Sequence, residues 1–164
     1  QQREKWASNL GIKQYDPATG TGTRKKGKKQ HILFTSIAYD TAKPIFPEGD
    51  PRYLYAKRLI LFSGIANDTP FRNYLCGNYK IVKHINYPDH HKFSRSDIRS
   101  IEEVARTFPT SVVMTTEKDC QRVRDCVKIS DNLKLRLFYV PIKAEFLAEP
   151  DKDKFTEVLK SFLK

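Results

Sequence analysis

The sequence predicts an α/β fold with a mainly parallel sheet and helices on both of its faces, a three-layer sandwich. Two observations predict this fold. From about residue 57, apolar runs of strand length alternate with segments whose apolar residues repeat at helical spacing. The composition, with 39% hydrophobic and 12% aromatic residues, is sufficient for a packed core. Such alternation is typical of parallel sheets, because each parallel neighbour requires a long crossover that a helix usually provides.

Four strand–helix pairs are predicted, in the order β-α-β-α-β-α-β-α. The strands are short apolar or alternating runs, at 57–63, 79–87, 111–116 and 135–142. The helices follow polar capping residues and repeat apolar residues every three or four positions, at 68–76, 94–108, 117–126 and 151–163. Ser94 and Asp97 have the spacing of a capping box, which marks the start of the second helix.

A separate N-terminal part, residues 1–50, is expected to precede an α/β domain at 51–164. Its expected elements are a helix at 2–10, a flexible polar loop or hairpin tip at 16–30, and a strand at 31–39. We expect that strand to pair with the segment near Pro44 and Pro47, as an N-terminal antiparallel two-stranded linker.

The formal net charge is +11, and most of it is local. Residues 1–30 carry eight basic and two acidic side chains, which account for six of the eleven charges. A basic chain is compatible with nucleic acid, anionic lipid or a phosphorylated substrate, and equally with a solvated loop. The segment Gly22–Lys29 resembles a phosphate-binding loop. It lacks the preceding strand and following helix that such loops need, and Lys29 replaces the magnesium-binding Ser or Thr.

Cysteine usage and hydropathy predict reduced cysteines and no membrane-spanning segment. Cys76, Cys120 and Cys126 include no CxxC pair, which favours a reduced cytosolic compartment over a disulfide framework or zinc site. We expect no secretory signal and no membrane span, because the N-terminus is polar and no apolar run approaches about 20 residues.

Three polar segments directly follow predicted strands, and these are the candidate functional residues. They are Ser63–Asn67, Tyr87–Phe93 and Thr115–Asp119. Because the carboxyl ends of parallel strands meet at one edge of a sheet, the three segments are expected to line one crevice. An Asp beside a His can orient the ring and raise its basicity, so Asp89 and His90 suit proton transfer.

Each segment also has a purely structural interpretation, which the sequence leaves open. Asn67 can serve only in a strand-to-helix turn. Thr116 can simply cap the following helix, with Glu117 placed favourably at its positive end and with Lys118 and Asp119 in solvent. Asp89 can cap a turn. A metal site is not expected, because adjacent histidines rarely bind one ion and no carboxylate cluster completes a ligand shell.

Taken together, SGIAN, PDHHKF and TTEKD, in this order and spacing, resemble the tetraacyldisaccharide 4′-kinase family of lipid A biosynthesis. The stretch FTSIAYDTAKPIFP is similar to the linker of the Bacteroidetes branch. The resemblance covers roughly residues 31–147 and corresponds to the C-terminal portion of that family. Asp68, Cys120 and Tyr87 depart from the usual residues of the motifs, although none of these changes removes a polar group from them.

The resemblance implies a kinase that transfers the ATP γ-phosphate to the 4′-hydroxyl of a lipid A disaccharide 1-phosphate precursor. It implies that His90, supported by Asp89, assists the proton transfer. The residues expected to shape the crevice are Asn67, His91, Thr116, Glu117, Lys118 and Asp119. ATP and Mg²⁺ would be bound mainly by an N-terminal domain that this chain lacks. This chain alone would then be soluble and inactive, and the whole protein would lie peripherally on the cytoplasmic face of the bacterial inner membrane.

Two other functional classes are considered. A DHH-type phosphoesterase needs further Asp and His motifs to hold two metals, and the sequence has no glycine-rich GGH segment of that kind. A basic nucleic-acid-binding module usually interleaves aromatic with basic residues, whereas residues 16–30 contain no aromatic residue. We therefore expect no nucleic-acid partner.

Overall fold

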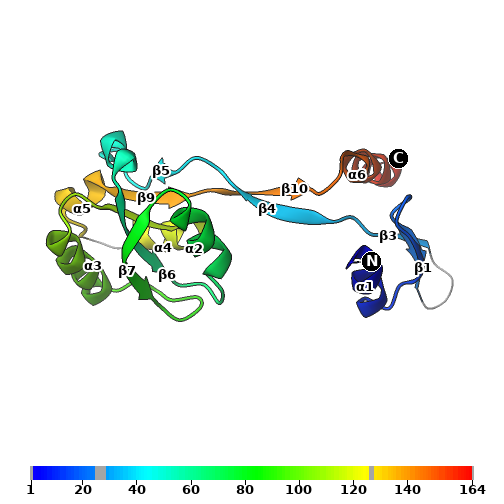
Figure 1. Cartoon of the computed structure of the whole chain (residues 1–164), viewed down its shortest axis with the longest axis horizontal. Helices are drawn as coiled ribbons and strands as arrows, with labels where there is room; N and C mark the ends of the chain where they lie inside the picture. The colour runs from blue at the N-terminus through cyan, green and yellow to red at the C-terminus, as the bar shows by residue number, and fades with distance from the viewer. Residues whose placement is uncertain (1, 25–28, 126–127, 164) are drawn as a thin grey trace. The chain divides into compact units, whose positions relative to one another are not determined.

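The computed structural model describes residues 2–24, 29–125 and 128–163 (Figure 1). The chain divides into two compact units. Unit 1 contains residues 1–38 and 143–164, and unit 2 contains residues 39–142. The division does not coincide with the expected boundary at residue 50, because both ends of the chain belong to unit 1.

Unit 2 is built on a five-stranded sheet in the order β5-β9-β8-β6-β7. Its four longer strands are β6 (Arg58–Ser63), β7 (Lys80–Asn86), β8 (Val112–Thr116) and β9 (Leu137–Val140), and all of them run parallel. The short edge strand β5 (Lys43–Pro44) pairs antiparallel with β9. The prediction of a mainly parallel sheet is confirmed.

Both faces of this sheet are covered. Because side chains alternate along a strand, Leu59 and Leu61 of β6 pack on one face with α2 (Thr69–Cys76). Ile60 and Phe62 point to the other face. The helices on that face are α3 (Arg95–Thr107), α4 (Glu117–Arg124) and α5 (Asp131–Leu135). The predicted three-layer arrangement is confirmed. The sequence analysis missed α5 and the short helix η1 (Pro51–Tyr55).

Polar caps start the helices at the carboxyl edge of the sheet. The Ser94 side chain accepts a hydrogen bond from the Asp97 amide. The Asp97 carboxylate in turn accepts one from the Ser94 amide at 2.7 Å, as predicted for a capping box. Thr116 accepts the Asp119 amide at 3.1 Å and caps α4. At α2 the Asn67 side chain, rather than Asp68, accepts the Thr69 amide at 3.0 Å.

Unit 1 differs from the sequence prediction at two points. The expected loop at 16–30 contains strands, because β2 (Thr21–Thr23) pairs antiparallel with β1 (Lys13–Asp16) and with β3 (Lys29–His31). Residues 25–28 of that loop lie outside the described residues. The segment that resembles a phosphate loop therefore begins in one strand and ends in another, which is the context of a hairpin.

The second difference concerns the two-stranded pair. β4 (Thr35–Tyr39) pairs with β10 (Ile142–Phe146), and not with the segment near Pro44 and Pro47. The pairing is antiparallel, since bonds join the Leu147 amide to the Phe34 carbonyl and the Asp40 amide to the Pro141 carbonyl. Pro44 instead lies in β5, at the edge of the main sheet.

Two helices complete unit 1, α1 (Gln2–Asn9) and α6 (Glu149–Phe162). The C-terminal helix thus begins two residues earlier than predicted, with Pro150 in its first turn. Within the described part of the chain, every helix is too short or too polar to cross a lipid bilayer.

Candidate functional site

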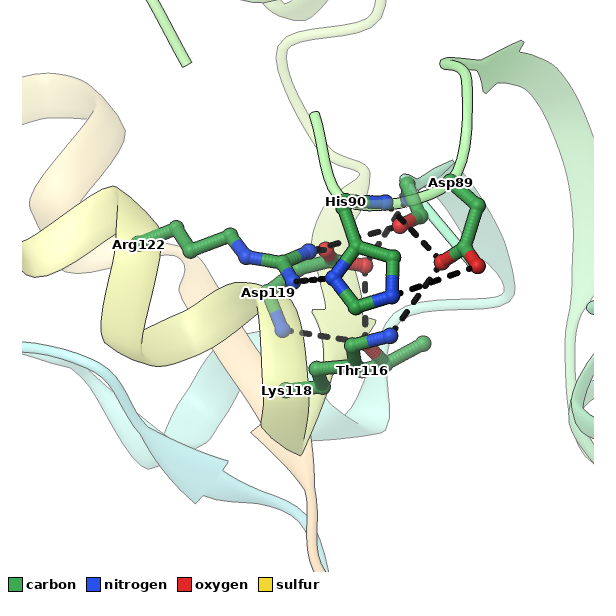
Figure 2. A network of polar contacts seen from close by, with 7 residues as sticks. Asp89, His90, Thr116, Lys118, Asp119 and Arg122 are labelled. Carbon is green, nitrogen blue, oxygen red and sulfur yellow. Dashed lines mark hydrogen bonds and ion pairs between the residues drawn. The ribbon is translucent and has the colours of Figure 1, made fainter. Parts of the chain in front are cut away.

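The candidate site lies where the connections of the parallel sheet diverge. From β6 the chain crosses through α2 to β7 on one side of β6, whereas β8 lies on the other side of β6. In open α/β sheets, ligand crevices form beside the carboxyl ends of strands at such a point. The segments after β6, β7 and β8 are the three polar segments singled out in the sequence, and hydrogen bonds join them directly (Figure 2).

Asp119 is the centre of this hydrogen-bond network. Its side chain is fully buried and accepts the Gly64 amide at 2.9 Å and the Thr116 hydroxyl at 2.7 Å. Its second oxygen accepts the Arg122 guanidinium at 3.0 Å. Burial of a carboxylate is favourable only when its charge is paired and its oxygens are hydrogen-bonded, and both conditions hold here. Asp119 thus fixes the loop after β6 to the start of α4.

The loop after β7 is attached to the same framework. The His90 amide donates to the Gly64 carbonyl at 3.2 Å, and also to the Asp89 carboxylate at 2.9 Å. The Lys118 ammonium contacts the same Asp89 oxygen at 3.1 Å. The hydrogen bond from Lys118 holds the pKa of Asp89 below its usual value, so this exposed carboxylate stays ionised over the physiological range.

The imidazole of His90 lies between a carboxylate and a guanidinium and is open to solvent (Figure 2). Its side chain is 73% exposed, and its φ of 61° is in the left-handed region that non-glycine residues seldom adopt. Arg122 Nη2 lies 3.4 Å from Nδ1, and the Asp89 carboxylate lies 3.5 Å from Nε2. Because a guanidinium only donates, the contact favours the tautomer with its proton on Nε2, facing Asp89.

His91 has a different environment. Its ring stacks on Tyr87, with centroids 4.6 Å apart, and its Nε2 lies 3.0 Å from the Asp97 carboxylate at the start of α3. Burial alone would raise the pKa of Asp97, but hydrogen bonds from Ser94 and His91 outweigh it and lower that pKa. The two adjacent histidines are thus distinguished: the His90 ring is exposed beside Asp89 and Arg122, and the His91 ring is held in the packing around α3.

Besides His91, two further residues that were expected to shape the crevice lie outside this network. Asn67 caps α2 through its side-chain oxygen. Glu117 accepts the Ile142 amide at 3.1 Å, at the start of β10. The structure therefore brings together Asp89, His90, Thr116, Lys118 and Asp119, and places Asn67, His91 and Glu117 in contacts with neighbouring structural elements.

Arg122 is a member of the network that the sequence analysis missed. It contacts Asp119, the Gly64 carbonyl at 3.4 Å and the His90 ring. The sequence contains a signal for this role of Arg122. It follows Asp119 by three residues and Lys118 by four, and this spacing places all three side chains on one side of a helix. The TTEKD motif ends at Asp119, so the family resemblance does not extend to Arg122.

A second polar cluster, also missed, lies at the end of β6 on the α2 side. Ser63 and His84 both contact the same oxygen of the buried Asp68 carboxylate, His84 Nε2 at 2.7 Å. Burial alone would raise the pKa of Asp68, but the bond from Ser63 and the charge of His84 lower it. The cluster ties the start of α2 to the edge strand β7.

Comparisons with known proteins agree with the motif resemblance. The family model for tetraacyldisaccharide-1-P 4′-kinase matches residues 8–164. A tetraacyldisaccharide 4′-kinase from Parabacteroides distasonis is 29% identical over 79% of this chain and 37% of its own length. One from Flavobacterium johnsoniae is 33% identical over 72% of this chain and 32% of its own length. The chain therefore spans about a third of the curated relatives it matches.

A solved structure is also similar, that of the "apo" form of LpxK from Aquifex aeolicus in complex with ATP. It is 15% identical, covers 76% of this chain and 35% of its own, and has a TM-score of 0.45. The extent of the family match, which covers nearly all of the sequence, is decisive for classification. The chain belongs to the tetraacyldisaccharide-1-P 4′-kinase family.

Proposed function

We propose that this chain is the C-terminal part of a kinase that transfers the γ-phosphate of ATP to the 4′-hydroxyl of a lipid A disaccharide 1-phosphate precursor. The relatives are named tetraacyldisaccharide 4′-kinases, and these names support a kinase reaction at a 4′ position. The observation that carries the proposal is the arrangement around His90, an exposed ring placed between Asp89 and Arg122 at the switch point of the sheet. Each of these groups has a use in phosphoryl transfer.

His90 is the proton-handling group of this arrangement. Phosphoryl transfer requires positioning, charge stabilisation and a group that manages the hydroxyl proton. The contacts to Asp89 and Arg122 orient the imidazole and define which nitrogen carries its proton in this conformation. A shift of Arg122 away from Nδ1 frees that nitrogen to accept a proton from a sugar hydroxyl, and the Asp89 carboxylate stabilises the imidazolium that forms.

Lys118 and Arg122 supply positive charge beside the ring. Both lie on α4. Lys118 contacts Asp89 in the segment after β7, and Arg122 contacts the Gly64 carbonyl in the loop after β6. Arginine and lysine side chains are suited to contact phosphate oxygens, whose negative charge grows or shifts during transfer. Asp119 acts indirectly, because its buried carboxylate holds Arg122 and the Gly64 amide in place.

The described residues suit a phosphoryl group better than a metal ion. In residues 2–24, 29–125 and 128–163, no group of three or more His, Cys, Asp and Glu side chains is arranged to bind a metal. Asp119 already has three partners, and Asp89 is paired with Lys118. We therefore propose that ATP and Mg²⁺, which supplies charge neutralisation when bound, are held mainly by the part of the kinase outside this chain. We also propose that the protein contacts the inner-membrane surface through that same part, whereas the 4′-hydroxyl of the lipid precursor reaches His90.

The test uses the full-length kinase that contains this chain. Because His90 has a left-handed backbone, His90→Asn is preferable to alanine: asparagine tolerates that conformation and cannot exchange protons near neutral pH. Transfer of labelled phosphate from ATP to the lipid acceptor is measured together with the melting temperature. General acid–base assistance is typically worth about 10²–10⁴-fold, so kcat should fall by roughly that factor while the melting temperature stays within about 2 °C.

Lys92→Ala is the matched control, since this exposed residue lies in the same loop and outside the network. It should retain normal kcat. Near-normal kcat in His90→Asn would remove His90 from the mechanism, and loss of stability without loss of kcat would reassign it to folding.

A further inference from the structure

A groove lies beside α3 on the surface of unit 2, between this helix and the segment that leads into α5, and we call it the α3 groove. It consists of two adjoining cavities of about 430 and 330 Å³, and Glu102 and Ser130 line both of them. The cationic residues of its lining are Arg95, Arg99, Arg106, Lys128 and Arg136. Glu102 is the only acidic residue among the described residues that line it, so positive charge predominates.

Most of these cations are exposed and unpaired. The exposed ones are Arg95, Arg99, Arg106 and Lys128. In the described part of the chain, none of them forms an ion pair with an Asp or Glu side chain. Glu102 accepts the Ser130 amide at 2.8 Å, so its carboxylate is engaged in holding the two walls of the groove together. The α3 groove therefore has unpaired positive charge along its length.

Arg136 is the buried cation of the larger cavity, and it is only 2% exposed. Its guanidinium donates to neutral acceptors, which are the carbonyls of Ala105, Phe108 and Pro109 at the end of α3 and the side-chain oxygen of Asn132. The carboxyl end of a helix carries roughly half a negative charge, which offsets only part of the guanidinium charge. Nε is buried and has no hydrogen-bond partner among the described residues. A buried charge with only neutral partners is costly, and an anion beside it completes its neutralisation.

We propose that the α3 groove binds a phosphorylated anion, a phosphate monoester or inorganic phosphate, with its phosphate group in the larger cavity beside Arg106 and Arg136. Guanidinium groups match phosphate oxygens through pairs of parallel hydrogen bonds, and four of the five cations of the groove are arginines. Arg106 is exposed and contacts the anion directly, whereas Arg136 adds its incompletely compensated charge. The inference does not depend on the kinase reaction proposed above, because none of these residues belongs to the network around His90.

Ser130 provides a neutral donor in the same cavity. Its hydroxyl oxygen accepts the Leu133 amide at 3.4 Å, so the hydroxyl proton can be donated to a phosphate oxygen. The donors come from α3 and from the segment before α5, and the bond between Glu102 and Ser130 fixes these two elements against each other. An anion that enters the groove therefore meets a preformed set of donors.

A nucleic acid fits the α3 groove less well. Surfaces that bind single-stranded nucleic acids combine cations with aromatic side chains on which bases stack. The described residues that line the groove include no aromatic side chain. A phosphate headgroup on a lipid surface has the same chemistry as a soluble phosphate ester, so the experiment separates these two sources.

The test uses the ¹⁵N-labelled 164-residue chain, because the groove lies wholly in unit 2, which has its own hydrophobic core. The N–H signals of the arginine side chains are followed by nuclear magnetic resonance during titration with sodium phosphate at pH 7, and with sodium chloride at matched ionic strength. The signals of Arg106 and Arg136 should shift and saturate only in phosphate, with a dissociation constant of about 1 mM.

Two variants locate the contact. Arg106→Gln removes one exposed charge from the larger cavity and should weaken phosphate binding by about tenfold, since a charge-assisted hydrogen bond is lost. Arg58→Gln is the matched control, because it removes the same charge from an exposed arginine at the start of β6, outside the groove. Its affinity for phosphate should stay within about twofold of the wild type, since salt screens exposed charges that do not contact the anion. Backbone amide signals of β6 and β8 verify that both variants are folded.

Sedimentation with phosphatidylcholine vesicles that contain phosphatidic acid identifies the source of the phosphate group. Binding to these vesicles that Arg106→Gln abolishes assigns the site to a lipid headgroup. Saturation by phosphate without vesicle binding assigns it to a soluble ester. Both outcomes support the proposal.

Three outcomes would overturn it. Absence of saturable binding to phosphate together with absence of vesicle binding would exclude the anion site. Equal weakening by Arg106→Gln and Arg58→Gln would reduce the binding to general charge attraction. Binding of a single-stranded RNA oligomer that Arg106→Gln abolishes and phosphate does not displace would assign the groove to nucleic acid instead.

Discussion

The buried carboxylate of Asp119 accepts the backbone amide of Gly64 at 2.9 Å across 55 residues of sequence. This bond connects the end of β6 to the beginning of α4, and the Gly64 carbonyl in turn receives the His90 amide. Space around Gly64 is limited, because an added Cβ would lie 3.2 Å from both the Asp119 carboxylate and the His91 side chain. The candidate site thus depends on a close approach between three loops.

Replacement of Asp119 by alanine should destabilise unit 2 by about 3 kcal/mol. The change leaves the Gly64 amide and the Thr116 hydroxyl without an acceptor and removes the partner of the Arg122 charge. Urea unfolding of the chain, followed by far-ultraviolet circular dichroism, measures the loss. Asp125→Ala, an exposed carboxylate at the end of the same helix, should change stability by less than about 0.5 kcal/mol. Equal effects of the two variants would contradict the central role of Asp119.

His91→Ala should affect stability first, unlike a change at His90. The His91 ring stacks on Tyr87 and contacts the Asp97 carboxylate, and the loss of both interactions should cost about 2 kcal/mol. The measurement is the urea midpoint of the chain, compared with that of His90→Asn. If His91→Ala unfolds at the wild-type urea concentration, the ring does not support α3 as the structure indicates.

The cluster of Ser63, Asp68 and His84 should make the stability of the chain depend on pH. The folded pKa of Asp68 is lowered, so its contribution is present above the unfolded value of about 3.9 and is lost as pH falls through the folded pKa. Asp68→Asn should therefore be less stable than the wild type by about 1–2 kcal/mol at pH 6, and the difference should shrink from about pH 4 downward. Urea unfolding at several pH values measures it. A difference that persists undiminished at pH 2 would argue against an ionised Asp68.

The chain on its own should show no lipid phosphorylation and should bind ATP only at millimolar concentrations. The segment Gly22–Lys29 begins in β2 and ends in β3, so no helix N-terminus follows it to receive phosphate, as a phosphate-binding loop requires. Titration calorimetry with MgATP and a labelled-phosphate transfer assay are the measurements. Micromolar ATP binding, or transfer above background, would show that the chain contains a nucleotide site of its own.

The main sheet was predictable because its signals are local. Apolar runs such as Leu59–Phe62 are buried on both faces of the sheet, and Ser94 with Asp97 starts α3 as their spacing indicates. The pairing of strands that are distant in the sequence was harder to predict. The partner of β4 is β10, more than a hundred residues later, and short polar strands such as Thr21–Thr23 resemble loops in composition. Their formation depends on pairing partners rather than on local propensity.

The site was predictable in location but not in detail. Strand order and motif position were enough to bring the segments of Gly64, His90 and Asp119 to one edge. Which histidine is exposed beside Asp89 and Arg122 depends on the left-handed backbone of His90 and on the stacking of His91 against Tyr87. Neither property has a reliable sequence signal, because both arise from tertiary contacts.

The pairing of β4 with β10 has a consequence for how unit 2 is built into the chain. The polypeptide enters unit 2 near Asp40 and leaves it near Pro141, and a 2.9 Å hydrogen bond joins these two residues. Unit 2 is therefore an insertion whose ends are adjacent, rather than a domain appended to one terminus. Segments with adjacent ends can be excised, circularly permuted or transplanted between hosts while their internal sheet order is retained. The loops that form the candidate site are carried with such a module, because Gly64, His90 and Asp119 all lie within it.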